Sequence, residues 1–325
     1  MSIINGFQKK VEEALGALNF PQGPVGLYDP VSYVLSLGGK RIRPALCLTA
    51  CSLFEEKKLA DCLNPALGLE VFHNFTLLHD DIMDGSAMRR NQPTVHVKWN
   101  NNTAILSGDA MLIMAYQLIA RTPASALTPV LGVFSQTALE VCEGQQFDMD
   151  FESRMEVSES EFLEMIRLKT AVLLGASLKI GALIGGAGEV AANKLYQFGC
   201  DIGVSFQLQD DWLDVFGNDQ DFGKAIGGDI INNKKTYLLI SALNTLTGSA
   251  RKELEGWISK KEFDRNEKII AVRNLYATAN VSAKAKRLMN AYYENAICQL
   301  DQIDGSHAIK EELKAFAHGL MERSR

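Results

Sequence analysis

Two short acidic runs contain the side chains of this sequence that are best suited to chemistry. Both follow the pattern Asp-Asp-x-x-Asp, once at residues 80–84 and again at residues 210–214. On a helix, the first and last carboxylates of each run would share a face about 6 Å apart and repel each other. Apolar residues precede both runs, so the carboxylates are expected on core-forming helices. A cation, either a metal ion or nearby Lys and Arg side chains, must offset their charge.

The ligand chemistry of these runs favours a hard cation, because carboxylate oxygens select Mg²⁺, Mn²⁺ or Ca²⁺ over zinc or copper. Mg²⁺ usually binds through one or two carboxylates together with substrate phosphates, which suits two separate acidic runs. The sequence therefore predicts a magnesium site and a phosphorylated substrate. The alternative, two solvated acidic turns, is disfavoured because the pattern occurs twice in the same apolar setting. The expected metal ligands are Asp80, Asp81, Asp84, Asp210, Asp211 and Asp214.

Basic residues near the first acidic run form a candidate anion site. Residues 38–44 read GGKRIRP, with three cations between a glycine pair and a proline that is expected to start a helix. Glycines let the backbone approach a ligand, and a helix N-terminus favours phosphate. A solvated loop is the alternative. Arg89 and Arg90 could each bind a phosphate through two hydrogen bonds. His73 lies two turns before Asp80 on the same face, either as a ligand contact or as a core residue.

Hydrophobic periodicity predicts helices along the whole chain and no strand. The helices that would carry the acidic runs cover residues 61–84 and 194–216, and Ser158 with Glu161 predicts a capping box at the start of another. The remaining helices are expected at residues 2–18, 30–38, 44–54, 103–121, 127–149, 158–173, 236–246, 266–278, 281–303 and 307–322.

Length and composition indicate an ordinary globular protein. The chain has 325 residues, of which 47% are hydrophobic and 22% charged. Because residues between Lys40 and Lys234 are expected to serve one site, we predict a single domain over residues 1–325. The net charge of −6 argues against nucleic acid as a partner, since binding to a phosphate backbone requires a basic face.

Several features indicate a cytoplasmic protein. The first ten residues, MSIINGFQKK, lack the apolar core of a signal peptide, so export is not expected. Residues 172–188 are interrupted by Lys179 and are too short for a membrane span, which favours a buried helix. The six cysteines form no C-x-x-C pair, and reduced thiols in the cytoplasm fit them best.

Six motifs occur in one order along the chain, and together they resemble the trans-isoprenyl diphosphate synthases, the polyprenyl synthetase family that includes farnesyl and geranylgeranyl diphosphate synthases. The resemblance covers essentially the whole chain. It implies an all-α fold, a single large helical bundle around a deep central cavity, and a homodimer. The motifs are GGKRIRP (38–44), HNFTLLHDDIMDGSAMRR (73–90), EGQQFDMD (143–150), LKT (168–170), FQLQDDWLD (206–214) and FGKAIGGDIINNKKTY (222–237).

The resemblance also implies a reaction, the condensation of isopentenyl diphosphate with an allylic diphosphate, and a role for each matching residue. The two aspartate trios would face each other and hold about three Mg²⁺ ions, replaceable by Mn²⁺, on the allylic diphosphate. That diphosphate would also contact Arg89, Lys169, Thr170, Gln207, Lys224 and Lys234. The diphosphate of isopentenyl diphosphate would contact Lys40, Arg43, His73 and Arg90. Because Lys235 adjoins Lys234, the assignment between these two lysines stays open.

Two residues before the first acidic run are expected to set the length of the product. Thr76 lies on the Asp80 face of the helix and Phe75 is rotated from it, so the helical wheel leaves open which of them blocks a growing chain. The resemblance implies that an aromatic residue five before the first Asp marks short products. Animal farnesyl synthases carry a second aromatic at the position of Thr76, and bacterial ones carry two extra residues in the run. A C20 product is therefore favoured over a C15 product.

Three other functions remain as alternatives. A terpene cyclase would pair one Asp-rich motif with an Asn/Ser/Glu-type second motif, which FQLQDDWLD does not resemble. A non-catalytic subunit of a heteromeric prenyl synthase would be expected to lack the acidic runs. A metal-dependent phosphohydrolase would not require isopentenyl diphosphate. Arg323 and Arg325 could close over the second diphosphate, although a solvated tail is the alternative.

Overall fold

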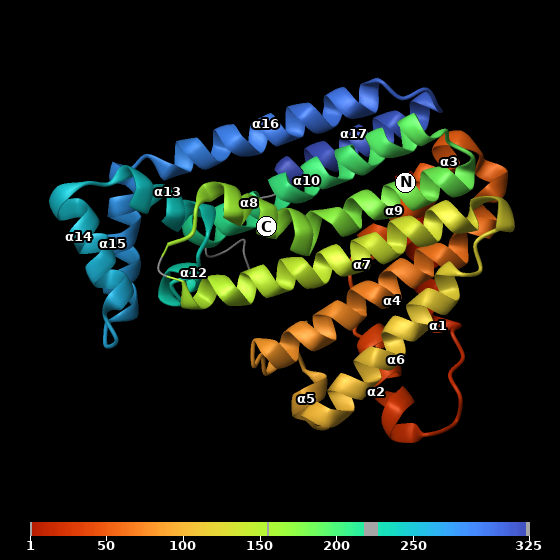
Figure 1. Cartoon of the computed structure of the whole chain (residues 1–325), viewed down its shortest axis with the longest axis horizontal. Helices are drawn as coiled ribbons and strands as arrows, with labels where there is room; N and C mark the ends of the chain where they lie inside the picture. Colours follow the sequence, from red (N-terminus) through yellow and green to blue (C-terminus); the bar gives the residue numbers. More distant parts are fainter. Residues whose placement is uncertain (1, 155, 218–226, 323–325) are drawn as a thin grey trace. The chain divides into compact units, whose positions relative to one another are not determined.

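The computed structural model describes residues 2–154, 156–217 and 227–322, which fold almost entirely into helices (Figure 1). This confirms the predicted all-α fold, whereas the deep central cavity stays a prediction. The helices are α1 (Ile3–Gly16), α2 (Val25–Ser36), α3 (Ile42–Phe54), η1 (Glu56–Lys58), α4 (Leu59–Met83), α5 (Val95–Lys98), α6 (Asn101–Ile119), α7 (Ala124–Ser153), α8 (Glu159–Ile166), η2 (Arg167–Ala171), α9 (Val172–Gly185), α10 (Glu189–Phe216), α12 (Gly228–Ile231), α13 (Tyr237–Thr245), α14 (Gly248–Ser259), α15 (Arg265–Thr278), α16 (Val281–Asp301) and α17 (His307–Met321).

Two helices begin earlier than the starts that were predicted from the positions of Pro30 and Pro44. The helix expected at Pro30 begins at Val25, directly after Pro24, whose extended backbone ends the preceding loop. The helix expected at Pro44 begins at Ile42, so that Pro44 is its third residue. The N–H groups of a first turn have no partner within the helix, so Pro44 loses no hydrogen bond there, whereas Pro30 lies inside α2 as its sixth residue. The predicted capping box at Ser158 and Glu161 is confirmed.

A short hairpin was not predicted. Its strands, β1 (Met88–Arg89) and β2 (Gln92–Pro93), pair antiparallel, and Arg90 and Asn91 form the turn between them with positive φ angles of 51° and 61°. Strands of two residues are too short for alternation to reveal. Helix α14 was also missed, because Leu254 is its one fully buried residue and its apolar stripe is weak.

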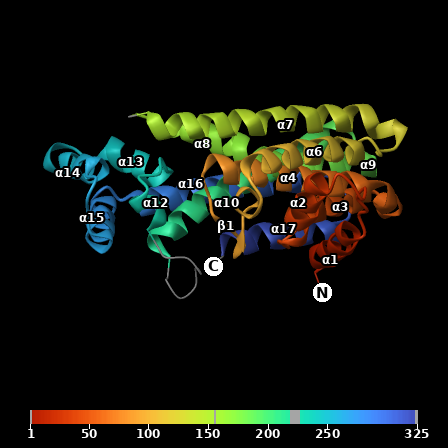
Figure 2. The same ribbon diagram turned by 90° about the horizontal axis from the view of Figure 1, so that it is seen from below.

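The chain divides into two compact units, each made from several segments, so the single-domain organisation stays a prediction. The first unit contains Met1–Gln136, Ala176–Tyr196 and Ile303–Glu312, and the second contains Thr137–Gly175, Gln197–Gln302 and Leu313–Arg325. In the first unit, α4 packs mainly against α6 and α3 (Figure 2). Gly68 of α4 allows this approach, because a Cβ there would lie 3.0 Å from the carbonyl oxygen of Ala115 on α6.

The second unit carries its own close helix contacts. Gly144 of α7 lies against η2, where a Cβ would be 2.3 Å from the backbone nitrogen of Lys169. Gly203 of α10 lies against η2 in the same way, with a Cβ only 2.6 Å from the Cα of Ala171. Helices α14 and α15 lie side by side in both views (Figures 1 and 2). These contacts hold η2 between α7 and α10.

The predicted buried apolar helix is part of the continuous helical stretch Glu159–Gly185. This stretch is long and apolar enough to cross a membrane by length and composition alone, but 78% of its most apolar window is buried inside the protein. It is therefore a core helix, as expected. All six cysteines lie in the described part of the chain and are free thiols.

Candidate active site

The first acidic run lies at the C-terminal end of α4, in the first unit. Asp81 is 5% exposed and Asp84 is the C-cap residue of the helix. The guanidinium of Arg89, on the hairpin, forms an ion pair with Asp81. Its Nε lies 2.9 Å from both carboxylate oxygens, and its Nη2 lies 2.8 Å from Oδ1. The expected cation beside this run is thus an arginine, which could exchange the carboxylate for a phosphate.

Arg43 and His73 form a second polar group in the first unit. Nη1 of Arg43 lies 3.1 Å from Nε2 of His73, and Nε of Arg43 is buried with no hydrogen-bond partner among the described residues. Burial lowers the pKa of Arg43 to about 10. Burial and the positive charges of Arg43 and Arg90 hold the pKa of His73 well below its ordinary value. His73 is therefore neutral at pH 7, and its Nε2 accepts from Arg43.

The absence of a side chain at Gly39 allows Arg90 to lie close to the backbone of the glycine pair. Arg90 donates to the carbonyl of Gly38, and a Cβ on Gly39 would lie 2.8 Å from Nη2 of Arg90. Arg41 is the one cation of GGKRIRP to which no substrate contact was assigned. Its guanidinium is buried and lies 2.7 Å from Glu12 and 2.8 Å from Glu70, so it links α1 to α4. Lys40 is exposed.

The second acidic run lies on α10 in the second unit, around the buried carboxylate of Asp211. Oδ1 of Asp211 accepts from Gln207 at 3.1 Å and lies 3.8 Å from Nζ of Lys234. Oδ2 is buried with no hydrogen-bond partner among the described residues. Burial raises the pKa of Asp211 to about 7, although the charge of Lys234 opposes the rise. A buried carboxylate oxygen without a partner is a strong acceptor for a cation.

Asp229 was not predicted and completes this cluster. Its backbone nitrogen donates to Oδ2 of Asp214 at 2.9 Å, and its carboxylate lies 3.8 Å from Nζ of Lys234. Burial lowers the pKa of Lys234, but the carboxylates of Asp211 and Asp229 outweigh it and raise the pKa above its ordinary value. The GGD sequence at residues 227–229 was in a quoted motif, but only the fold reveals its contact with α10.

Lys169 and Thr170 lie in η2, whose π-helical turn interrupts the α-helical stretch. Nζ of Lys169, which the resemblance assigned to the allylic diphosphate, lies 2.5 Å from Oδ2 of Asp148 on α7. Asp148 is the second acidic residue that was not assigned a role. Its position in EGQQFDMD was visible, but its partner depends on the close α7–η2 contact at Gly144.

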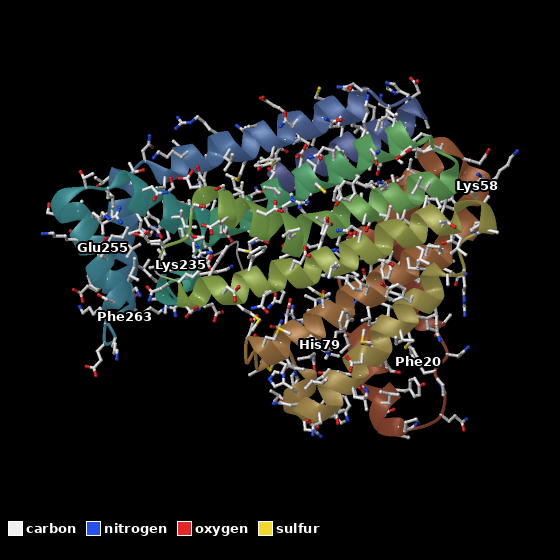
Figure 3. The ribbon with its side chains drawn as sticks, viewed as in Figure 1. Phe20, Lys58, His79, Lys235, Glu255 and Phe263 are labelled. Carbon is white, nitrogen blue, oxygen red and sulfur yellow. The ribbon has the colours of Figure 1, made fainter. Side chains whose placement is uncertain are left out.

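Of the two adjacent lysines, Lys234 contacts the acidic cluster. Lys235 lines a separate groove of about 1390 Å³, together with Arg154, Arg251 and Glu255 of α14. Lys235 and Glu255 are labelled in Figure 3. Lys224, which the sequence assigned to the allylic diphosphate, lies outside the described residues, as do Arg323 and Arg325.

The residues fit a magnesium ion by donor chemistry. Within residues 2–154, 156–217 and 227–322, no three His, Cys, Asp or Glu side chains are gathered closely enough to hold a metal ion. The carboxylates that would bind one are instead paired with cations, Asp81 with Arg89 and Asp211 with Lys234. The unpartnered Oδ2 of Asp211 is the oxygen that a hard cation would satisfy.

The candidate length-determining residues lie four and five residues before the acidic run, a little more than one helical turn. Phe75 is 9% exposed, and its ring centroid lies 5.6 Å from that of Phe72 and 4.8 Å from that of His79. Thr76 is half-buried, and its hydroxyl donates to the carbonyl of His73 at 2.8 Å. Phe75 therefore belongs to an aromatic cluster, and Thr76 is satisfied by its own helix.

Comparisons with known proteins show the family and the fold of this chain. The polyprenyl synthetase family matches residues 24–276. The geranylgeranyl diphosphate synthase of Methanosarcina mazei is 38% identical over 293 residues, which cover 90% of this chain and 88% of that protein. A crystal structure of a geranylgeranyl pyrophosphate synthase shares 41% identity and superimposes with a TM-score of 0.93 over 99% of both chains. The geranylgeranyl pyrophosphate synthetase of Pyrococcus horikoshii superimposes with a TM-score of 0.92 at 30% identity, over 99% of this chain and 98% of that one.

Proposed function

Because the chain belongs to the polyprenyl synthetase family, we propose that it is a short-chain trans-prenyltransferase that condenses isopentenyl diphosphate with an allylic diphosphate. Its product is geranylgeranyl diphosphate, as the names of its relatives suggest. The observation that carries the proposal is the match of the family over residues 24–276, which include both acidic runs. The ion pairs of these runs with Arg89 and Lys234 support it.

The reaction begins when the C–O bond of the allylic diphosphate breaks to leave an allyl cation and pyrophosphate. Mg²⁺, bound by Asp80, Asp81, Asp84, Asp210, Asp211 and Asp214, would neutralise the charge that develops on the leaving oxygens. Arg89, Lys169 and Lys234 each exchange a carboxylate for a diphosphate oxygen, which adds donors where negative charge grows. Gln207, Thr170 and Lys224 complete this set.

The second substrate binds to the basic residues of the first unit. Arg43, Arg90 and Lys40 contact the diphosphate of isopentenyl diphosphate, and neutral His73 orients Arg43 through the bond at 3.1 Å. The double bond of this substrate attacks the allyl cation and forms a C–C bond. The new cation loses one proton to the departed pyrophosphate, which leaves an allylic diphosphate five carbons longer. Apolar walls must exclude water, which would convert the cation to an alcohol.

The length of the product depends on the residues that stop the growing chain. Phe75 fills space beside α4 with its ring, and Thr76 presents a small side chain one residue later. We therefore expect a C20 product in preference to a C15 product.

The active form is a homodimer that uses the exposed apolar face of α6. Ile105, Leu106 and Ile113 on this helix are 45%, 60% and 59% exposed, which is unusual for large apolar side chains on one helix. A second copy of the chain would cover them by two-fold symmetry. Sedimentation velocity of Leu106→Lys should give a monomer, and an unchanged dimer would argue against this face.

The remaining parts of the proposal concern metal and location. Mn²⁺ is expected to replace Mg²⁺ because both favour oxygen ligands. The buried core helix and six free thiols support a cytoplasmic enzyme.

The test is incubation of the purified protein with Mg²⁺, labelled isopentenyl diphosphate and each of the C5, C10 and C15 allylic primers, followed by chromatography of the dephosphorylated products. A C20 alcohol supports the proposal. Cyclic hydrocarbons formed without isopentenyl diphosphate would indicate a terpene cyclase. Phosphate release without that substrate would indicate a phosphohydrolase, and no reaction would fit a non-catalytic subunit.

A further inference from the structure

Lys268 of α15 is a buried lysine with neutral partners. Its side chain is 1% exposed, and Nζ donates to Oδ1 of Asn233 at 2.7 Å and to the carbonyl of Ile231 at 3.3 Å. The ammonium also lies 4.2 Å from the ring centroid of Phe263, in the loop between α14 and α15 (Figure 3). Burial lowers the pKa of Lys268. Burying an ammonium is costly unless its donors are used, so these contacts need an explanation.

The two oxygens that Lys268 binds belong to the segment that carries Asp229 and Lys234. Ile231 ends α12, and Asn233 adopts the left-handed conformation with φ 52°. The side-chain amide nitrogen of Asn233, Nδ2, also donates to the carbonyl of Ile258 at 3.1 Å. The next residue, Lys234, donates its backbone N–H to the carbonyl of Asp229 at 2.9 Å. The bonds from Lys268 therefore fix the turn from which the Lys234 side chain emerges.

Helix α15 supports the beginning of the same segment as well. Gly227 has φ 84°, and a Cβ there would lie 2.7 Å from Cδ1 of Ile269, the residue after Lys268. The backbone nitrogen of Gly227 donates to the carbonyl of Asp214 at 2.7 Å. Segment 227–234 is thus held by α15 at both ends and by α10 through Asp214.

We propose that Lys268 is a positioning residue that holds segment 227–234 so that Lys234 and Asp229 stay beside Asp211. The inference rests on the proposed function, because it takes this cluster to bind the metal-bound diphosphate. A charged donor suits the task, since an ammonium can bind two oxygens at once and such bonds are stronger than neutral ones. Lys268 itself contacts neither substrate nor metal.

The test compares Lys268→Met with wild type. Methionine keeps most of the apolar stem and removes the three donors. Calorimetric titration with inorganic pyrophosphate in the presence of Mg²⁺ should show an affinity about 10- to 100-fold weaker, as is typical when a residue supporting a ligand shell is lost. The KM for the allylic diphosphate should rise, and the KM for isopentenyl diphosphate should stay unchanged.

Lys284→Met is the matched control. Lys284 belongs to the same unit and donates to the hydroxyl of Thr245, away from segment 227–234. The Lys284→Met variant should keep the wild-type affinity for pyrophosphate. Wild-type affinity in Lys268→Met overturns the proposal, whether or not its melting temperature falls, because a purely structural role would lower stability alone.

Asn233→Gly is a second route if Lys268→Met does not fold. Glycine accepts the positive φ at this position and removes the Oδ1 acceptor of Lys268. It should weaken pyrophosphate binding in the same direction, and unchanged binding overturns the proposal. The wild-type protein separates the two hypotheses: if it neither binds magnesium pyrophosphate nor condenses the substrates, the proposed function itself fails.

Discussion

The ring of His79 lies against the ring of Phe75 with centroids 4.8 Å apart and planes at 66°. His79 lies on the side of α4 that meets α6 (Figure 3), where its Nε2 is 3.1 Å from the carbonyl oxygen of Ile105. A Cβ on Gly108 of α6 would lie 2.1 Å from that nitrogen. Helix α6 therefore determines where the imidazole lies, and the imidazole supports the phenyl ring.

Replacing Phe75 by alanine should lengthen the product. The substitution removes the ring beside α4, so a growing chain can extend by about one more isoprene unit, which corresponds to four or five residues of helical rise. Chromatography of dephosphorylated products measures this directly. Thr76→Ala is the matched comparison, and a longer product from that variant alone would assign the role to Thr76.

Gly108→Ala should shift the product distribution in the same direction, but less. The new methyl group would displace the His79 ring, whose movement removes the support of Phe75 without moving backbone. Gly132→Ala is a suitable control, because apart from the backbone of its own helix no described atom lies within 4 Å of its added Cβ. If Gly108→Ala folds normally and keeps the wild-type products, the imidazole does not influence chain length.

Asp211→Asn should stabilise the protein without ligand, and more so at pH 8 than at pH 5. Burial raises the folded-state pKa of Asp211 from 3.8 to about 7, so folding opposes its ionisation. The penalty is absent below pH 3.8, grows as pH rises towards 7, and is complete above it. The gain in the free energy of unfolding is up to about 4 kcal/mol.

Thermal melts of Asp211→Asn and wild type across this pH range measure the difference. Asp150→Asn, at an exposed aspartate, should show no such trend. A gain that is larger at pH 5 than at pH 8 would contradict the sign of the shift.

The sequence predicted the fold well where helices bury long apolar stripes. Both acidic runs lie on the expected helices, α4 and α10, because apolar periodicity directly reflects burial. Asp148 and Asp229 were missed because their roles depend on distances to Lys169 and Lys234, which no local pattern encodes. Lys268 was missed as well, since nothing in a sequence distinguishes a buried lysine from a solvated one.

The partners of neighbouring basic residues could not be read from the sequence. Arg41 and Arg43 are two residues apart, but Arg41 is in a buried ion pair with Glu70, whereas Arg43 contacts His73. The pattern of basic residues does not show which carboxylate or imidazole each side chain will meet, because Glu70 and His73 come from another helix, α4. Arg41 itself precedes α3 with a left-handed backbone, φ 46°.

The rate of condensation in Asp81→Ala, Asp210→Ala and the double variant, at saturating Mg²⁺, tests most directly whether both acidic runs serve one reaction. Each single variant should lose at least about 100-fold in kcat, because each removes a carboxylate that we propose as a metal ligand stabilising the leaving pyrophosphate. The double variant should lose less than the product of the single losses, as expected for groups that act together. A near-normal rate in either single variant, with the protein folded and Mg²⁺ present, would contradict the account.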